Sequence, residues 1–261
     1  LPQYGMTLDL IYSLQGLDYV FLNLDIYTLR DGSDYTYYEN PPYLYDNNRW
    51  NDVSYLLNRD VLMDVLPSYV RHQGDHVPLD DAFAYEDRAV FSREVVLAAH
   101  RAWLDSHPQQ AAMLPRDAYY EALTSSLAKV SGYIEAHPET AYYVFLPPYS
   151  ILNWKQYIRL GEADAVLGTI DEAARVLLGY ENVRFFCFMG AENIITDLDR
   201  YFDTVHYNRA TCEELVSRML AGDCEMTSEN RAAFMEALTA FVWNYDYEAL
   251  FDQPPEPTGL L

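Results

Sequence analysis

The sequence predicts an α/β fold with a mostly parallel sheet, and three short apolar runs and one helical pattern carry this prediction. The runs at residues 18–25, 141–146 and 183–188 are rich in aromatic and branched residues, as buried parallel strands are. Between the second and third runs, apolar residues recur at helical spacing from 156 to 178. A strand, a helix and a strand in this order form a unit with parallel strands and a right-handed crossover.

The other predicted elements are helices. They lie at residues 117–136, in two or three pieces between 52 and 106 around a break at 73–81, near 193–202 and 212–221, and at 228–250. Three strands are few for a domain of this size, since about five are usual. We therefore expect at least one strand upstream of residue 1, of which residues 1–5 could be the end. We expect one N-terminally incomplete domain over residues 1–261, with a helical insertion at about 52–106.

The chain is strongly acidic. Asp and Glu number 40 against 17 Lys and Arg, so the formal net charge at pH 7 is -23. Such a surface repels phosphate backbones and anionic lipid headgroups, so we expect this segment to bind neither nucleic acid nor a membrane. No apolar run approaches the roughly 18 residues of a membrane span, and no signal peptide is visible. Because the chain begins with Leu1 rather than Met, we expect any leader or membrane anchor to lie upstream.

Cysteine and histidine spacing predicts no metal site. Cys187, Cys212 and Cys224 are an odd number without a CxxC pair, which argues against a disulfide framework and against zinc. Cys187 lies in an apolar run, so we predict that it is a small core residue. No histidine other than His206 has an acidic or cysteine partner at a suggestive spacing. We therefore expect neither a metal nor another cofactor.

Tyrosine is frequent in this chain. There are 24 tyrosines, and many lie between residues 35 and 55. A tyrosine side chain has a flat apolar face and a polar tip, which suits both sugar rings and protein partners. We favour the alternative of a polar, tyrosine-rich loop folded onto its own domain, because tyrosine is commonly only partly buried.

The most informative motif is Asp203-Thr-Val-His206. A carboxylate three residues before a histidine can accept the proton of Nδ1, which leaves Nε2 as the nitrogen that takes a proton from a nucleophile. These two residues would supply two thirds of an acyl-transfer triad, whereas no activated serine is evident in the sequence. The alternative is an Asp that caps a helix, beside a partly exposed His whose proximity is accidental.

Four segments in a fixed order resemble one family. They are Pro42-Tyr-Leu-Tyr-Asp46, Asn51-Asp-Val-Ser-Tyr-Leu-Leu-Asn58, Phe145-Leu-Pro-Pro-Tyr-Ser-Ile-Leu-Asn-Trp154 and Ile194-Ile-Thr-Asp-Leu-Asp-Arg-Tyr-Phe-Asp-Thr-Val-His-Tyr207. Together they resemble the SGNH (GDSL-type) hydrolase-like proteins of bacterial cell envelopes. Those proteins are similar to D-alanyl-lipoteichoic acid transfer proteins and to polysaccharide O-acetyltransferase or esterase domains. The resemblance spans most of the chain from Asp18 onward and is strongest at Pro-Pro-Tyr-Ser and Asp-x-x-His-Tyr.

The resemblance implies a flavodoxin-like, three-layer α/β/α fold with a catalytic triad at the carboxyl edge of the sheet. Asp203 and His206 match the Asp-x-x-His block of the family. The family serine lies in a Gly-Asp-Ser or Gly-Ser-Ser turn after the first strand, and this sequence has no such turn. Gly5 is a candidate for an oxyanion glycine, and Asp25 stands near the place of the oxyanion asparagine. Neither role is assigned.

The loop after the second predicted strand supplies the candidate substrate-binding residues Tyr149, Ser150 and Asn153, and Trp154 falls on it too. Ser150 is also an alternative nucleophile because it follows a strand. Its neighbours are Tyr149 and Ile151, however, and not the glycines that a strained nucleophile elbow needs. We therefore expect the Ser150 hydroxyl to end the strand or to line the cleft.

The resemblance implies an enzyme that hydrolyses or transfers an acyl group, acetyl or D-alanyl, on a glycan of the cell envelope or on an acylated small molecule. Residues 1–261 alone would then be inactive, because the serine would lie upstream. The alternative is a non-catalytic envelope protein that binds a glycan or a protein partner in the same cleft. In both cases the resemblance implies an extracytoplasmic location.

Overall fold

The chain divides into two compact units, which are described separately. The computed structural model describes residues 2–32 and 89–252, together with residues 43, 48, 50–57, 59, 62–63 and 66–71. Residues 36–85 form one unit, and the remaining residues form the other. The smaller unit contains the short helices α3 (Val53–Leu56) and α4 (Leu66–Arg71). The predicted break at residues 73–81, and Tyr35, Tyr37, Tyr38 and Tyr45 of the tyrosine-rich segment, lie outside the described residues.

The larger unit contains a four-stranded sheet in the order β1-β2-β3-β4. Strands β1 (Tyr19–Asn23), β2 (Ala141–Leu146) and β3 (Val183–Cys187) are parallel, and β4 (Glu225–Met226) pairs antiparallel to β3. The predicted α/β class and its mostly parallel sheet are therefore confirmed. Strand β4 was not predicted from the sequence, because two residues are too few to show an alternating pattern.

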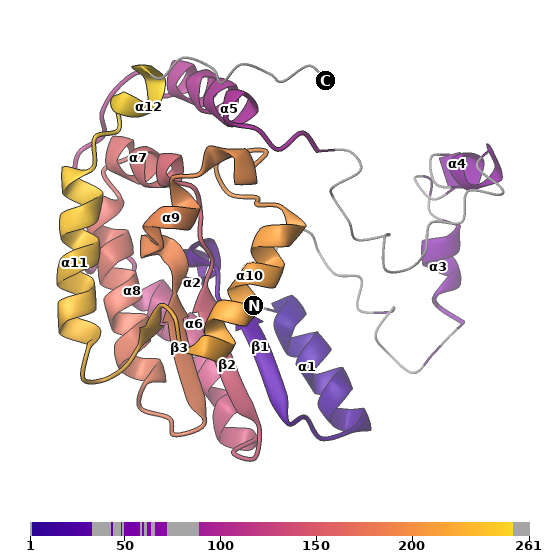
Figure 1. The fold of residues 1–261 in the computed structure, drawn as a ribbon. Helices are drawn as coiled ribbons and strands as arrows, with labels where there is room; N and C mark the ends of the chain where they lie inside the picture. Colours follow the sequence, from indigo (N-terminus) through magenta and orange to yellow (C-terminus); the bar gives the residue numbers. More distant parts are fainter. Residues whose placement is uncertain are drawn as a thin grey trace. The chain divides into compact units, whose positions relative to one another are not determined.

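Helices surround this sheet (Figure 1). In chain order they are α1 (Pro2–Leu14), α2 (Ile26–Asp31), α5 (Arg93–Ser106), α6 (Tyr120–Ala136), α7 (Ile151–Arg159), α8 (Ala163–Leu177), α9 (Glu192–Ile195), α10 (Arg209–Ala221), α11 (Arg231–Asn244) and α12 (Ala249–Asp252). The prediction that residues 1–5 end a strand is wrong, because residues 2–5 begin α1. A proline is well suited to the first turn of a helix, where its missing N–H is not needed.

The predicted helix at residues 156–178 is two helices, α7 and α8, separated by Gly161. This glycine has φ of 70°, a left-handed conformation that favours residues without a Cβ. A Cβ at this position would also overlap the backbone carbonyl of Ala112. Leu114 N donates a hydrogen bond of 2.7 Å to the Gly161 carbonyl, so the segment before α6 fixes the place of the break.

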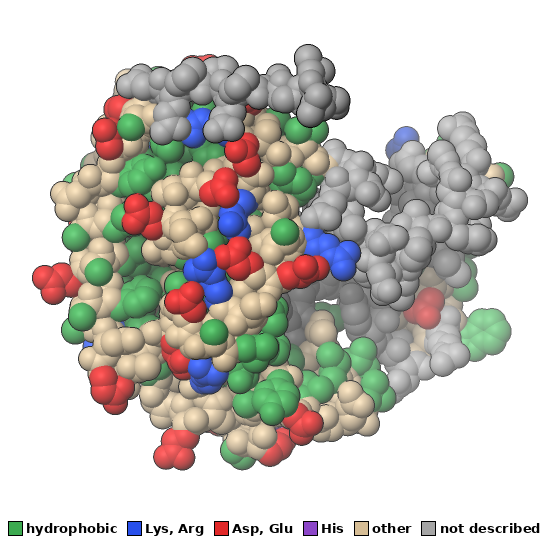
Figure 2. Space-filling model, in the orientation of Figure 1, with side chains coloured by type: hydrophobic (Ala, Val, Ile, Leu, Met, Phe, Trp, Pro, Cys, Tyr) green, Lys and Arg blue, Asp and Glu red, His purple; other side chains and the backbone are tan. Residues whose placement is uncertain are grey.

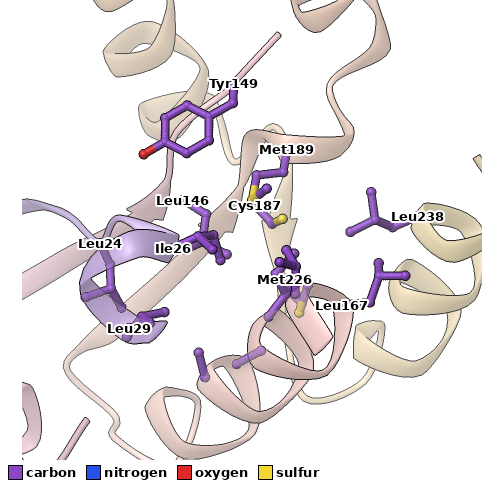
Figure 3. Packing of buried hydrophobic residues seen from close by; sticks show 14 of the residues in the cluster. Leu24, Ile26, Leu29, Leu146, Tyr149, Leu167, Cys187, Met189, Met226 and Leu238 are labelled. Carbon is purple, nitrogen blue, oxygen red and sulfur yellow. The ribbon is translucent and has the colours of Figure 1, made fainter. Parts of the chain in front are cut away.

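Most of the core lies on one face of the sheet. Buried residues of the strands, including Val20, Val144, Leu146 and Phe185, belong to one cluster with residues of α2, α6, α8 and α11. Figure 3 shows part of this cluster, with Leu146 beside Ile26 and the Tyr149 ring above them. Cys187 is fully buried in the same cluster, which confirms the prediction that it is a core residue.

A smaller cluster lies on the opposite face, where Phe186 and Phe188 pack against Leu215 and Met219 of α10. Helices therefore cover both faces of the sheet. Figure 2 shows Asp and Glu side chains spread over the described part of the visible surface, with Lys and Arg among them. Among the described helices, none is both long and apolar enough to cross a membrane.

Replacing two helical glycines with alanine should change the stability of the protein in opposite directions. A Cβ at Gly168 in α8 would overlap the backbone carbonyl of Arg116, whereas a Cβ at Gly132 in α6 would meet nothing within 4 Å. Alanine is the better helix former by about 1 kcal/mol. We therefore expect Gly132→Ala to stabilise the protein by up to about 1 kcal/mol, and Gly168→Ala to destabilise it by about 2 kcal/mol or more because of overpacking. Urea unfolding of both variants measures this, and a stable Gly168→Ala protein would contradict the close contact.

Because His100 of α5 is buried, we expect the folded protein to lose stability in mild acid. Its side chain is fully buried, and neither ring nitrogen has a hydrogen-bond partner. Burial, with a smaller contribution from the charge of Lys155, lowers the pKa of His100 from 6.5 to about 4. Between these values the unfolded chain binds the proton more readily, so stability falls as the pH falls. We expect His100 to account for about 2 kcal/mol lost between pH 7 and pH 5. Urea unfolding of wild type and His100→Leu at both pH values checks this, and equal losses in the two proteins would contradict it.

Candidate active site

The candidate site lies where the three parallel strands end. Parallel strands place their carboxyl ends at one edge of a sheet, which is where α/β proteins bind ligands. Asp25 follows β1, the loop 147–150 follows β2, and the chain after β3 passes through α9 to the loop 202–206. The loop 202–206 carries the Asp-x-x-His motif.

The loop 202–206 is closed by its own backbone and is attached to the loop after β2. Tyr201 and Tyr207 form an isolated antiparallel bridge, and Phe202 N donates a 3.2 Å hydrogen bond to the His206 carbonyl. The Tyr201 hydroxyl is buried and donates a 2.6 Å hydrogen bond to the Pro148 carbonyl. The position of the motif is therefore determined by the end of β2.

Ser150 makes the second attachment between these loops. Its backbone N–H and its hydroxyl both donate to the Thr204 carbonyl, at 3.1 and 2.9 Å. The Thr204 hydroxyl in turn donates to Oε1 of Gln156 at 3.3 Å. Ser150 is fully buried, so the role that the structure gives its hydroxyl is to join the two loops.

Asp203 holds the ring of His206 in a defined orientation. One carboxylate oxygen, Oδ1, accepts hydrogen bonds from the backbone N–H groups of Val205 and His206, each at 2.7 Å. The other, Oδ2, lies 2.7 Å from Nδ1 of His206. The two backbone bonds form a turn that fixes the carboxylate, and the carboxylate then selects the tautomer with a proton on Nδ1. The arrangement that the spacing predicts is therefore present.

Both groups of this pair have shifted pKa values. Burial alone would raise the pKa of Asp203, but the hydrogen bonds from the His206 side chain and from two backbone N–H groups outweigh it, so the pKa is lowered. The hydrogen bond to Asp203 raises the pKa of His206, burial opposes this, and the charges of Asp203 and Asp25 add to it. The pair therefore stabilises the protonated imidazole, as a general base requires after it takes a proton.

His206 is accessible from solvent at this edge. Its side chain is 58% exposed, and its ring stacks on Phe202 with centroids 5.1 Å apart and an interplanar angle of 9°. Phe202 is itself in edge contact with Phe91 at 5.6 Å. An aromatic support on one side and a carboxylate at Nδ1 leave the imidazole little freedom to rotate.

Asp25 belongs to the site, although its position in the sequence did not predict a definite role for it. Its Oδ1 accepts a 2.7 Å hydrogen bond from Tyr27 N and so caps α2. Burial raises the pKa of Asp25, and the nearby Tyr149 hydroxyl partly offsets this without reaching hydrogen-bond geometry. The charge of Asp25 also acts on His206, so the end of β1 is electrostatically coupled to the loop 202–206. Its position directly after a parallel strand was the signal that could have indicated it.

The three predicted substrate-binding residues lie near the pair but point into the protein. Tyr149, Ser150 and Asn153 are each exposed by 3% or less. The Tyr149 hydroxyl and Oδ1 of Asn153 have no hydrogen-bond partner, and Nδ2 of Asn153 donates to the Tyr27 hydroxyl at 3.3 Å. Burial and the charge of Asp25 raise the pKa of Tyr149. Contact of these residues with a substrate stays a prediction.

Within the part of the chain that the structure describes, no group of three or more His, Cys, Asp or Glu side chains could hold a metal ion. Comparisons of the chain with protein-family models, with curated proteins and with solved structures find no match.

The geometry of the pair predicts how His206 titrates. We expect the pKa of His206 to lie above its ordinary value of 6.5 in the wild-type protein and to fall in Asp203→Asn, because the amide carries no charge and cannot hold the imidazolium as well. An NMR titration that follows the ring Cε1–H signal measures both values. The backbone amide signals of β2 are the control for an intact fold, and they should be the same in both proteins. An unchanged His206 curve in the variant would show that Asp203 does not act on the imidazole.

Proposed function

We propose that the larger unit is an SGNH-type acyl esterase or acyltransferase domain with a flavodoxin-like, three-layer α/β/α fold. The observation that carries this proposal is the 2.7 Å contact between Asp203 Oδ2 and His206 Nδ1 at the carboxyl edge of a parallel sheet. An Asp-His pair of this kind is the part of an acyl-transfer triad that moves the proton.

In this proposal His206 is the general base and Asp203 orients it. The nucleophile is a serine upstream of Leu1. As its hydroxyl oxygen attacks the acyl carbonyl, the serine proton passes to Nε2 of His206, and backbone N–H groups stabilise the oxyanion. The proton then goes to the leaving alcohol as the ester bond breaks. Water or an acceptor hydroxyl removes the acyl group from the serine by the reverse sequence.

The acyl group is acetyl or D-alanyl, and the partner is a cell-envelope glycan or an acylated small molecule, in an extracytoplasmic location. This part of the proposal is supported by the resemblance of the Pro-Pro-Tyr-Ser and Asp-x-x-His-Tyr segments to envelope proteins. The acidic composition agrees with a substrate other than nucleic acid, because a net charge of -23 repels phosphate backbones.

The second candidate is a non-catalytic member of the same group that binds a glycan or a protein. One observation favours it. Ser150 joins the motif-bearing loop directly through Thr204, yet its hydroxyl is buried and committed to a backbone carbonyl. If no other serine reaches His206, the pair would act as a binding element and not as a base.

Activity of a polypeptide that includes the residues encoded before Leu1 tests the proposal. We expect it to react with a fluorophosphonate and to hydrolyse p-nitrophenyl acetate, with a rate that rises with pH through the raised pKa of His206. His206→Ala should lower the rate by at least about 100-fold, the usual contribution of a general base. His137→Ala is the matched control, because His137 lies before the start of β2, at the amino ends of the parallel strands. The His137→Ala protein should retain the wild-type rate.

Two results would contradict this assignment. A His206→Ala protein with the wild-type rate would remove His206 as the base. Rapid turnover by residues 1–261 alone would place the nucleophile within this chain and not upstream of it.

A further inference from the structure

The carboxylate of Asp25 keeps hydrogen-bonding capacity that the protein does not use. Its Oδ1 accepts the 2.7 Å hydrogen bond from Tyr27 N. Its other oxygen, Oδ2, accepts no hydrogen bond from the residues that the structure describes, and the side chain is partly exposed. A carboxylate has room for about four hydrogen bonds. A group bound at this edge of the sheet can therefore use Oδ2.

The charge of Asp25 is also poorly compensated. No Lys or Arg among the described residues forms an ion pair with it. The cation that acts on Asp25 is Arg30, but Arg30 forms its own ion pairs with Asp31 at 3.1 Å and with Glu162 at 3.4 Å. Burial therefore outweighs the effect of Arg30, and the pKa of Asp25 is raised. A cation from outside the chain would stabilise this carboxylate.

A group of buried polar side chains surrounds Tyr27, the residue that Asp25 caps. Tyr149, Asn153 and Tyr157 are exposed by 3%, 1% and 2%, and the two hydroxyls and Oδ1 of Asn153 have no hydrogen-bond partner. The Tyr27 ring lies 6.0 Å from that of Tyr149 and 6.4 Å from that of Tyr157, between centroids. Nδ2 of Asn153 donates to the Tyr27 hydroxyl at 3.3 Å. Three unpaired polar atoms therefore lie in one small region of an otherwise apolar core.

The Tyr149 hydroxyl is aimed at Asp25. In Figure 3 it points to the side of the sheet on which Leu24, the residue before Asp25, lies. The same hydroxyl acts on the Asp25 carboxylate and lowers its pKa in part. Buried polar atoms without partners cost stability, so a group of them at a sheet edge indicates a functional use. Here the unpaired atoms surround one partly exposed carboxylate.

The unused groups suit a primary ammonium as their ligand. Oδ2 of Asp25 and Oδ1 of Asn153 can only accept hydrogen bonds, and an ammonium supplies three donors together with a positive charge. An anion would be repelled by Asp25 and Asp203. A metal ion is less suited, because the described residues contain no group of three or more His, Cys, Asp or Glu side chains that could hold one.

Asp25 lies close enough to the Asp-His pair to act on the same ligand. Leu24 N donates to the Phe145 carbonyl at 2.8 Å, so Asp25 directly follows the pairing of β1 with β2. The loop after β2 is hydrogen-bonded to the loop 202–206. Neighbouring strands are about 4.8 Å apart, which places Asp25 on the order of 10 Å from that loop. The charge of Asp25 acts on His206.

We propose that Asp25 anchors a binding subsite for a primary ammonium group beside His206. The ammonium contacts Oδ2 of Asp25, and the polar groups around Tyr27 supply further acceptors. Within the proposed function, on which this last step rests, the ligand is an ester. An acetyl group carries no charge and no donor for Asp25. The substrate therefore carries an ammonium, either on its acyl group or on its sugar.

NMR titration of residues 1–261 with two small amides tests the subsite. Alaninamide and lactamide differ in an ammonium against a hydroxyl, and the ammonium is mostly charged at pH 7. We expect alaninamide to shift the backbone amide signals of Tyr27 and His206 in a saturable way, and lactamide to bind at least about 10-fold more weakly. Asp25→Asn should weaken alaninamide binding by about 10-fold or more. Asn still caps α2, so this variant should fold.

Asp18→Asn is the matched control. Asp18 is an exposed acid directly before β1, at the opposite end of the strand from Asp25. This variant should bind alaninamide as the wild type does. A cation attracted only by the net charge of -23 would bind equally to the wild type and both variants, and that result would overturn the proposal. Equal binding of lactamide and alaninamide, or no saturable shift at Tyr27, would overturn it too.

A second titration, with glucosamine and glucose, identifies the source of the ammonium. Stronger binding of alaninamide than of glucosamine would place the ammonium on the acyl group, and the reverse would place it on the sugar. Both results support the subsite if Asp25→Asn removes the binding. None of these measurements uses turnover. Ammonium binding without esterase activity would contradict the proposed function alone, and esterase activity without ammonium binding would contradict the subsite alone.

Discussion

The carbonyl group of Thr204 is the acceptor on which the candidate site depends. Both donors of Ser150, its backbone N–H and its hydroxyl, bond to it, and the Tyr201 hydroxyl bonds to Pro148 beside them. These bonds tie a loop that follows the third strand to the turn that follows the second. Without them Asp203 and His206 could still form their local turn, but the loop that carries the turn would lose its hydrogen bonds to the loop after β2. Ser150 therefore positions the loop that carries the motif, and this explains why Ser150 is buried.

The sequence predicted those features of the fold and the site that residues close together in the chain determine. The apolar pattern predicted the three parallel strands. The spacing of three positions between Asp203 and His206 predicted the contact between their side chains. The break at Gly161 could not be predicted in this way, because the carbonyl of Ala112, almost fifty residues earlier, determines it. The burial of Tyr149, Ser150 and Asn153 likewise depends on the loop around Thr204. Contacts between distant segments leave no period in a sequence.

The two carboxylates of the site, Asp203 and Asp25, differ in their hydrogen bonding and in the direction of their pKa shifts. Asp203 has hydrogen bonds at both oxygens and a lowered pKa, whereas burial raises the pKa of Asp25 at the end of the neighbouring strand. A carboxylate that is fully bonded stays ionised and steers the imidazole. One that is poorly solvated is more easily protonated, and it sits among the tyrosines Tyr27 and Tyr149. The site therefore combines a fixed negative charge with a second acid whose charge responds to its surroundings.

The segment between α5 and α6 has no regular secondary structure, yet it belongs to the framework. Ala111 N and Leu114 N donate to the carbonyls of Arg159 and Gly161, and the Arg159 guanidinium returns hydrogen bonds to the carbonyls of His107 and Pro108. Gly161 and Gly168 allow its backbone to approach the helices closely. An insertion in this segment would move the backbone groups of residues 107–114 away from their hydrogen-bond partners at Arg159 and Gly161. Length variation in related proteins should therefore be rare in this irregular stretch, against the usual tolerance of surface loops.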